Sequence, residues 1–90
     1  MKNNDGKVSN NSYQKLNIYP NPFHDHINIQ SDQTLTAIKV YDVFGKVVYV
    51  ENSLFTTNKI LETEDLAPGL YFISVQLADH SISSLKVIKN

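Results

Sequence analysis

Residues 70–77, Leu70-Tyr71-Phe72-Ile73-Ser74-Val75-Gln76-Leu77, form the stretch that decides the fold. The odd-numbered side chains from Tyr71 to Leu77 are apolar, whereas Ser74 and Gln76 between them are polar. Successive side chains of a β-strand point to opposite faces, so this period of two predicts an antiparallel strand with one buried face. Phe72 interrupts the polar face and suggests a contact surface there.

The same period recurs on both sides of this stretch, in short runs separated by turn residues. The strands predicted from it cover residues 16–19, 26–30, 36–41, 46–51, 58–62, 70–77 and 82–88. The residues expected in their common core are Ile27, Ile29, Ile38, Val40, Tyr71, Ile73, Val75, Leu85 and Val87. Seven short strands without an amphipathic helix predict an all-β fold, a seven-stranded antiparallel β-sandwich of the Ig-like type.

Proline, glycine and aspartate mark the turns between these strands. Two prolines at positions 20 and 22 fix two φ angles and remove two backbone donors, which predicts a rigid strand exit. The pair Pro68-Gly69 fits the central positions of a type II turn, with a positive φ at the glycine. Residues 42–45 and 78–81 carry further turn signals.

The chain divides into a polar leader and one small domain. Residues 1–15 contain too few sizeable apolar side chains to offset the entropy of ordering the backbone, so we expect a flexible linker there and a folded domain over residues 16–90. With 8 basic and 9 acidic side chains, the net charge is -1. This balance argues against nucleic-acid binding, and no apolar run is long enough to span a bilayer.

Histidine and aspartate clusters offer only weak chemistry. His24 and His26 would share one side of a strand, but zinc or copper needs three or four converging ligands, and a polar turn explains the His24-Asp25-His26 run better. The chain has no cysteine, and no serine sits in a nucleophile-elbow pattern. We therefore expect no catalytic residue, no metal ligand and no cofactor.

Tyrosines on a flat sheet face could stack on sugar rings. The five candidates are Tyr13, Tyr19, Tyr41, Tyr49 and Tyr71. Tyrosine is also favoured in strands for its packing alone, which is the simpler explanation. An adhesive or carbohydrate-binding module of a surface protein is nevertheless the alternative function.

Four short segments occur in a characteristic order. They are Tyr19-Pro20-Asn21-Pro22, then Asp42-Val43-Phe44-Gly45, then Leu66-Ala67-Pro68-Gly69-Leu70-Tyr71, and last Lys86-Val87-Ile88-Lys89. Together they resemble the C-terminal sorting domain, type A, of cargo proteins of the type IX, or Por, secretion system of Bacteroidetes. The pattern of that family is a YPNP-like motif, a central Asp-x-x-Gly segment, an LxxGxY motif and a short basic end.

The resemblance implies a sorting signal that catalyses no reaction of its own. In the family, an N-terminal cargo protein reaches the periplasm, crosses the outer membrane through a translocon and arrives at the cell surface or in the medium. A sortase-like cysteine protease commonly removes the sorting domain by cleavage in the linker. We accordingly expect translocon components, this protease and an N-terminal cargo domain as partners of a monomer that is not an enzyme.

The family positions match residue by residue. They are Tyr19, Pro20, Asn21, Pro22, Asp42, Gly45, Leu66, Pro68, Gly69 and Tyr71, followed by the basic end at Lys86 and Lys89. Most of these have ordinary structural duties in turns or in the core. The sequence gives no structural role to the two terminal lysines. The predicted recognition segment is therefore Lys86, Val87, Ile88 and Lys89. We expect replacement of both lysines to change stability only slightly.

Overall fold

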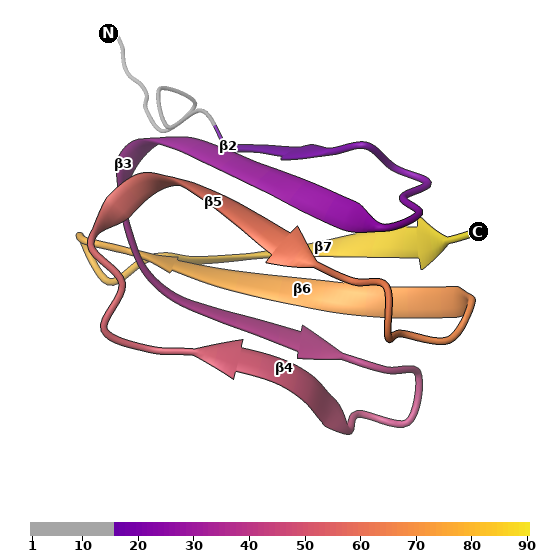
Figure 1. The fold of residues 1–90 in the computed structure, drawn as a ribbon. Helices are drawn as coiled ribbons and strands as arrows, with labels where there is room; N and C mark the ends of the chain where they lie inside the picture. Colours follow the sequence, from indigo (N-terminus) through magenta and orange to yellow (C-terminus); the bar gives the residue numbers. More distant parts are fainter. Residues whose placement is uncertain (1–15) are drawn as a thin grey trace, which may run out of the picture.

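The computed structural model describes residues 16–90, which form only strands, turns and loops (Figure 1). The strands are β2 (Leu16–Tyr19), β3 (His26–Tyr41), β4 (Val47–Glu51), β5 (Thr56–Glu62), β6 (Gly69–Leu77) and β7 (Ile82–Lys89). Within this part of the chain no helix is long and apolar enough to cross a membrane. The expected linker, residues 1–15, lies outside the described residues.

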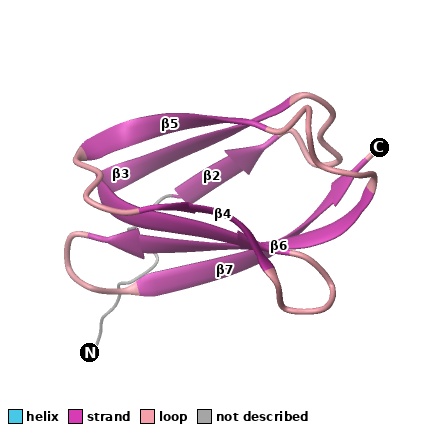
Figure 2. Ribbon diagram, turned by 60° about the horizontal axis from the view of Figure 1, so that its bottom comes forward, coloured by secondary structure: helices cyan, strands magenta, loops and turns pink. Residues whose placement is uncertain are grey.

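Strand β3 is the centre of the topology. Its first half pairs with β2 and β5, its second half pairs with β4 and β6, and β7 continues outward from β6. All of these pairings are antiparallel, as predicted. Because β3 bends between its two halves, the strands form two facing layers, with β2 and β5 in one and β6 and β7 in the other (Figure 2).

Residues 16–90 form six strands and not the seven predicted, because residues 26–30 and 36–41 belong to a single strand of 16 residues. The register of β3 shifts between Gln30 and Leu35 in its pairing with β5, which marks the bend. There the Ser31 hydroxyl oxygen accepts a hydrogen bond from the backbone N–H of Gln33 at 3.0 Å. The intervening residues include neither glycine nor proline, so the chain turns from one layer to the other while staying extended.

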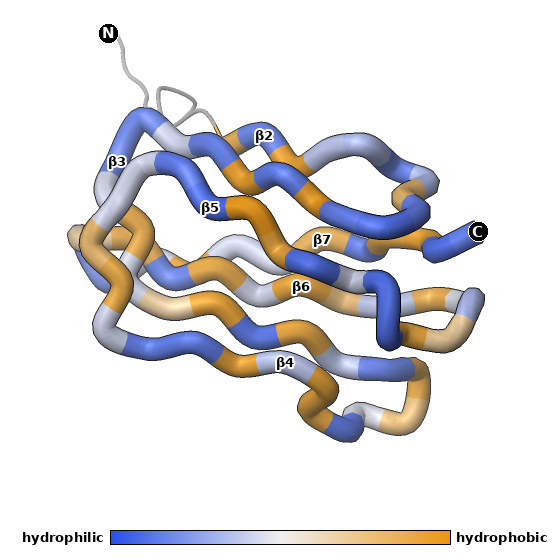
Figure 3. Tube along the Cα trace, in the orientation of Figure 1, coloured by the Kyte–Doolittle hydropathy of each residue, from blue (hydrophilic) through white to orange (hydrophobic). Residues whose placement is uncertain are grey.

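The buried residues form one hydrophobic core cluster. Apolar and polar residues alternate along the strands as predicted (Figure 3). The buried hydrophobic residues of the core are Phe23, Ile27, Ile29, Leu35, Ile38, Val40, Leu61, Tyr71, Ile73, Val75, Leu77 and Val87. Eight of the nine core residues expected from the sequence are therefore confirmed. The alternation works because each strand offers every second side chain to the same interior.

Leu85 is the exception, since its side chain is 41% exposed. It shares the inward face of β7 with the fully buried Val87, but it lies where β2 and β7 leave a crevice open to solvent. Half-buried Leu16 and Ile18 line the same crevice. Alternation identifies the face of a strand, whereas burial also requires that a second layer covers that point.

Both predicted glycine turns have positive φ, +82° at Gly45 and +148° at Gly69. The value at Gly69 lies far from the φ of about +80° of a type II turn, so that turn type is not confirmed. Side chains with a Cβ rarely adopt either conformation. Tyr19 ends β2 directly before Pro20, as the proline pair predicts.

Candidate functional site at one end of the sandwich

All four sequence segments singled out above lie at the same end of the sandwich, on the right of Figure 1. The β2–β3 loop, the β3–β4 hairpin, the β5–β6 loop and the end of β7 all lie at this end. These segments are far apart in the sequence, and only the folded sheet brings them together. We call this the motif end of the domain.

The first segment is fastened to the last strand by its asparagine. The Asn21 side chain accepts a hydrogen bond from the Ile88 N–H at 3.1 Å and donates one to the Lys86 carbonyl oxygen at 3.3 Å. Phe23 continues this pairing through its backbone, as its N–H donates to the Ile88 carbonyl at 2.8 Å and its carbonyl accepts from the Asn90 N–H at 3.0 Å. The loop after β2 therefore covers the outer edge of β7 from the Lys86 carbonyl onward.

Phe23 also closes the core at this end. Its side chain is fully buried and lies against Tyr71, with ring centroids 6.2 Å apart and ring planes tilted by 55°. Aromatic pairs favour such tilted arrangements. The sequence offers one signal for this residue, a large apolar side chain between two prolines and a polar run, but Phe23 is not one of the family positions.

The LxxGxY segment folds back on its own tyrosine. The Tyr71 hydroxyl donates a hydrogen bond to the Ala67 carbonyl oxygen at 2.5 Å, four residues earlier. This is the arrangement of a tyrosine corner, which fixes a crossover between the layers of many β-sandwiches. Gly69, between the two, supplies the positive φ. The motif therefore has a structural basis in its glycine and its tyrosine.

Lys89 overturns the expectation that both terminal lysines lack a structural duty. It is 7% exposed, and its Nζ donates to the carbonyl oxygens of Thr63, Glu64 and Leu66 at 2.6, 3.1 and 2.6 Å. An ammonium carries three donors, and here each has a carbonyl acceptor, which satisfies the buried charge. Lys89 thus ties the end of β7 to the β5–β6 loop.

The side chains of the last segment, residues 86–89, alternate between the core and the solvent. Val87 is fully buried, whereas Lys86 and Ile88 are exposed, with Ile88 at 47%. Alternation along β7 accounts for this division, because even-numbered side chains face outward. Of the four predicted recognition residues, the structure therefore presents the side chains of Lys86 and Ile88 to solvent.

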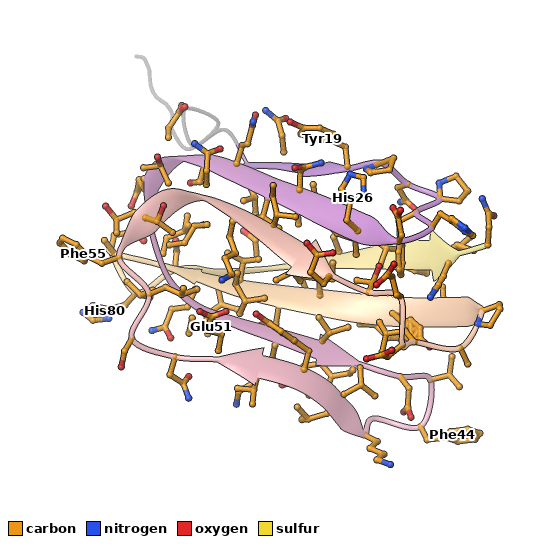
Figure 4. All side chains as sticks on the ribbon, in the orientation of Figure 1. Tyr19, His26, Phe44, Glu51, Phe55 and His80 are labelled. Carbon is orange, nitrogen blue, oxygen red and sulfur yellow. The ribbon has the colours of Figure 1, made fainter. Side chains whose placement is uncertain are left out.

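Asp42 organises the hairpin between β3 and β4. Its carboxylate accepts hydrogen bonds from the N–H groups of Phe44 at 2.9 Å and Lys46 at 3.0 Å. The backbone closes the same turn, since the Gly45 N–H donates to the Asp42 carbonyl at 3.0 Å. The hairpin holds Phe44 91% exposed at its tip (Figure 4). The Asp-x-x-Gly segment therefore builds a tight turn that presents an aromatic side chain.

The histidines do not converge. The Asp25 carboxylate lies 2.7 Å from His26 Nδ1, and this hydrogen bond lowers the pKa of Asp25. His80 lies at the opposite end of the molecule (Figure 4). Across residues 16–90 no group of three or more histidine, cysteine or acidic side chains could hold a metal ion. Asp79 has the turn role expected of it, accepting from the N–H and hydroxyl of Ser81.

The described tyrosines do not form one flat platform. Tyr71 is buried, Tyr19 is 42% exposed on β2, and Tyr41 is half-buried at the end of β3. The Tyr49 hydroxyl donates a hydrogen bond to the Glu51 carboxylate on β4. Burial and the neighbouring carboxylate raise the pKa of Tyr49 to about 12. Tyr13 lies outside the described residues. Among residues 16–90, the arrangement of the tyrosines does not favour the sugar-binding alternative.

The sequence model of one family, described as the secretion system C-terminal sorting domain, matches residues 17–90. The chain belongs to this family of type IX secretion sorting domains. The match covers the whole described domain except Leu16. The family is one of sorting tails and not of enzymes.

The proteins that the chain resembles are longer than the chain itself. The chain is 25% identical over 84 residues to the ulvan lyase NLR42 of Nonlabens ulvanivorans, covering 92% of this chain and 16% of the lyase. Its fold is similar to part of PorZ from Porphyromonas gingivalis, a surface component of the type IX secretion system, with a TM-score of 0.68 and 20% identity. That likeness covers 83% of this chain and 11% of PorZ. The chain therefore spans only a small part of either protein.

Proposed function

We propose that this domain directs an attached N-terminal cargo protein across the outer membrane through the type IX translocon, to the cell surface or the medium. The observation that carries the proposal is the motif end, where Asn21 and Lys89 tie the first and third family segments to the last one. The Asp42–Gly45 hairpin lies at the same end of the domain (Figure 1). A receptor that contacts this end meets parts of all four segments at once.

Within this surface, we assign direct recognition to Lys86 and Ile88, whose side chains are exposed at the end of β7. Val87 and Lys89 support recognition indirectly, by stabilising the fold of this end. Val87 packs in the core, and Lys89 hydrogen-bonds to the β5–β6 loop. Exposed cationic and apolar side chains beside each other suit a partner surface that is both acidic and apolar.

The proposed cleavage follows from the domain arrangement. Residues 1–15 serve as the linker to the cargo, and a sortase-like cysteine protease cuts there once the cargo has crossed the membrane. The polar composition of this segment supports the proposal, because proteases act on extended chains that lack a packed core. The cut would leave the sandwich of residues 16–90 intact.

A reporter export assay tests the function. The full chain is joined to the C-terminus of a periplasmic reporter in a host with a type IX system, where we expect the reporter on the surface or in the medium. Lys86→Ala should leave the reporter in the periplasm. Lys39→Ala is the matched control, because Lys39 is also an exposed lysine but lies on β3, outside the motif end. Export of the Lys86→Ala fusion at the parent level would contradict the assignment of Lys86.

A further inference from the structure

Strand β7 lies at the edge of its sheet, and its outer edge is covered along only part of its length. The pairing of β6 with β7 runs from Ile82 to Lys89 without a register shift, so the backbone groups of β7 alternate regularly between the two sides. The Ile88 and Asn90 N–H groups bond outward, to Asn21 and Phe23. The even-numbered residues of β7 therefore direct their N–H and C=O groups away from β6.

The cover formed by Asn21 and Phe23 ends at the Lys86 carbonyl oxygen. Within residues 16–90, no other segment pairs with this side of β7. By the same alternation, the N–H of Lys86 and both backbone groups of Ser84 point outward on the uncovered part. An open row of backbone donors and acceptors is a template for a further strand.

A crevice of about 240 Å³ runs beside this row, lined by Leu16, Ile18, Ser83, Ser84 and Leu85. Leu85 is 41% exposed on its inner side, so apolar surface is available next to the free backbone groups. On the opposite face of β7, the exposed Lys86 side chain carries a positive charge. One face of a strand added here would contact the crevice beside Leu85, and the other face would contact the Lys86 ammonium group.

We propose that residues 82–86 are a docking edge for an extended segment of a partner protein, which adds to β7 as a new strand. The backbone of that segment pairs with Ser84 and Lys86, its inward side chains are apolar and enter the crevice beside Leu85, and its outward side chains are acidic and face Lys86. Strand addition of this kind gains affinity from the main chain and specificity from alternate side chains. The inference rests on the proposed function for the partner's identity as secretion machinery.

The edge can be tested without that machinery. The probe is an end-blocked octapeptide of alternating valine and glutamate, titrated into the isotope-labelled full chain and followed by NMR. We expect the amide signals of Ser84 and Lys86 to shift and to become protected from hydrogen exchange. The same peptide with lysine in place of glutamate should bind more weakly, because its charges face Lys86.

Two variants report on the mechanism. Ser84→Pro removes an outward N–H that plays no part in the β6 ladder, and prolines are tolerated on such edges, so loss of one backbone hydrogen bond should weaken binding about tenfold. Ser84→Ala is the matched control and should bind like the parent. Leu85→Glu, at an already exposed position, should also weaken binding by placing a carboxylate in the crevice.

Absence of any shift at Ser84 and Lys86, or unchanged binding by both Ser84→Pro and Leu85→Glu, would overturn the docking edge. The reporter assay separates this failure from that of the proposed function. A parent domain that is exported but binds no strand refutes the edge alone. A domain that binds the strand but exports no reporter refutes the sorting role alone.

Discussion

Lys89 Nζ donates a hydrogen bond to the Leu66 carbonyl oxygen at 2.6 Å, across 23 residues of sequence. Leu66 begins the LxxGxY motif and Lys89 closes the basic segment, so two motifs that look independent in the sequence share one contact. The same ammonium holds Thr63 and Glu64. The basic end is therefore part of the structure that supports the other motifs.

Replacing Lys89 should destabilise the domain. Lys89→Met keeps the aliphatic length but leaves three carbonyls without their donor, at a cost of about 2 kcal/mol in unfolding free energy. For a domain of this size that corresponds to a thermal midpoint lower by about 10 °C, measurable by circular dichroism. Lys86→Met, at an exposed position, should stay within about 0.5 kcal/mol of the parent. Equal midpoints for the two variants would show that the Lys89 contacts contribute nothing.

The tyrosine corner gives a second prediction. Tyr71→Phe retains the packing against Phe23 but removes the donor to the Ala67 carbonyl, so the free energy of unfolding should fall by about 1 kcal/mol. Chemical denaturation measures this directly. Tyr19→Phe, which loses a hydroxyl from a 42% exposed ring, serves as the control and should unfold at the parent midpoint.

Gly69→Val tests the backbone conformation of the β5–β6 loop. A Cβ built at Gly69 meets no atom within 4 Å, so the cost comes from φ at +148° and not from a clash. We expect a loss of about 1 kcal/mol or more in unfolding free energy. Gly69→Ala should cost a similar amount, because it adds the same Cβ. Unchanged thermal unfolding of both variants would mean that the loop relaxes without strain.

Asn21 should slow the hydrogen exchange of the backbone amide of Ile88 at the end of β7. In Asn21→Ala the Ile88 N–H loses its acceptor, and hydrogen exchange at that amide should accelerate. Asn21→Asp retains an acceptor for Ile88 but loses the donor to the Lys86 carbonyl, so exchange at Ile88 should remain slower than in Asn21→Ala. The opposite order of the two variants would contradict the role assigned to the side-chain oxygen.

The Tyr49–Glu51 pair predicts a loss of stability in alkali. Folding raises the pKa of Tyr49 from 10.0 to about 12, so between these values the unfolded chain releases a proton that the folded domain retains. Stability supplied by the neutral hydroxyl is therefore complete below pH 10 and is lost as the pH rises toward 12. Tyr49→Phe should show a smaller decrease of the thermal midpoint over this range. Parallel curves for parent and variant would refute the linkage.

Much of the fold could be predicted from the sequence because strand alternation is local information. Residues 70–77 indicate their buried face without reference to any other segment, and the structure confirms it. The joining of residues 26–30 and 36–41 was not predictable in this way, because the polar residues between them resemble a loop and stay extended through pairing with other strands.

The candidate site, too, could be predicted from the sequence only in part. Motif order identified the family, and the turn roles of Asp42 and Gly69 follow from residue chemistry. The role of Lys89 does not, because a lysine close to the end of a chain is ordinarily exposed and its acceptors are backbone atoms 23 to 26 residues away. Main-chain acceptors have no side-chain signature in a sequence.

The fastening of Asn21 to β7 joins residues separated by 65 and 67 positions. Closing so long a loop lowers the entropy of the chain before the stabilising contacts have formed. For this reason β-sandwiches rich in long-range contacts fold slowly, over about milliseconds to seconds. The contacts that Asn21 and Lys89 make at the motif end require β7 to be in place, so they are the last of its contacts to form. A receptor that binds this surface would select finished domains over folding intermediates, so recognition would be coupled to the kinetics of folding.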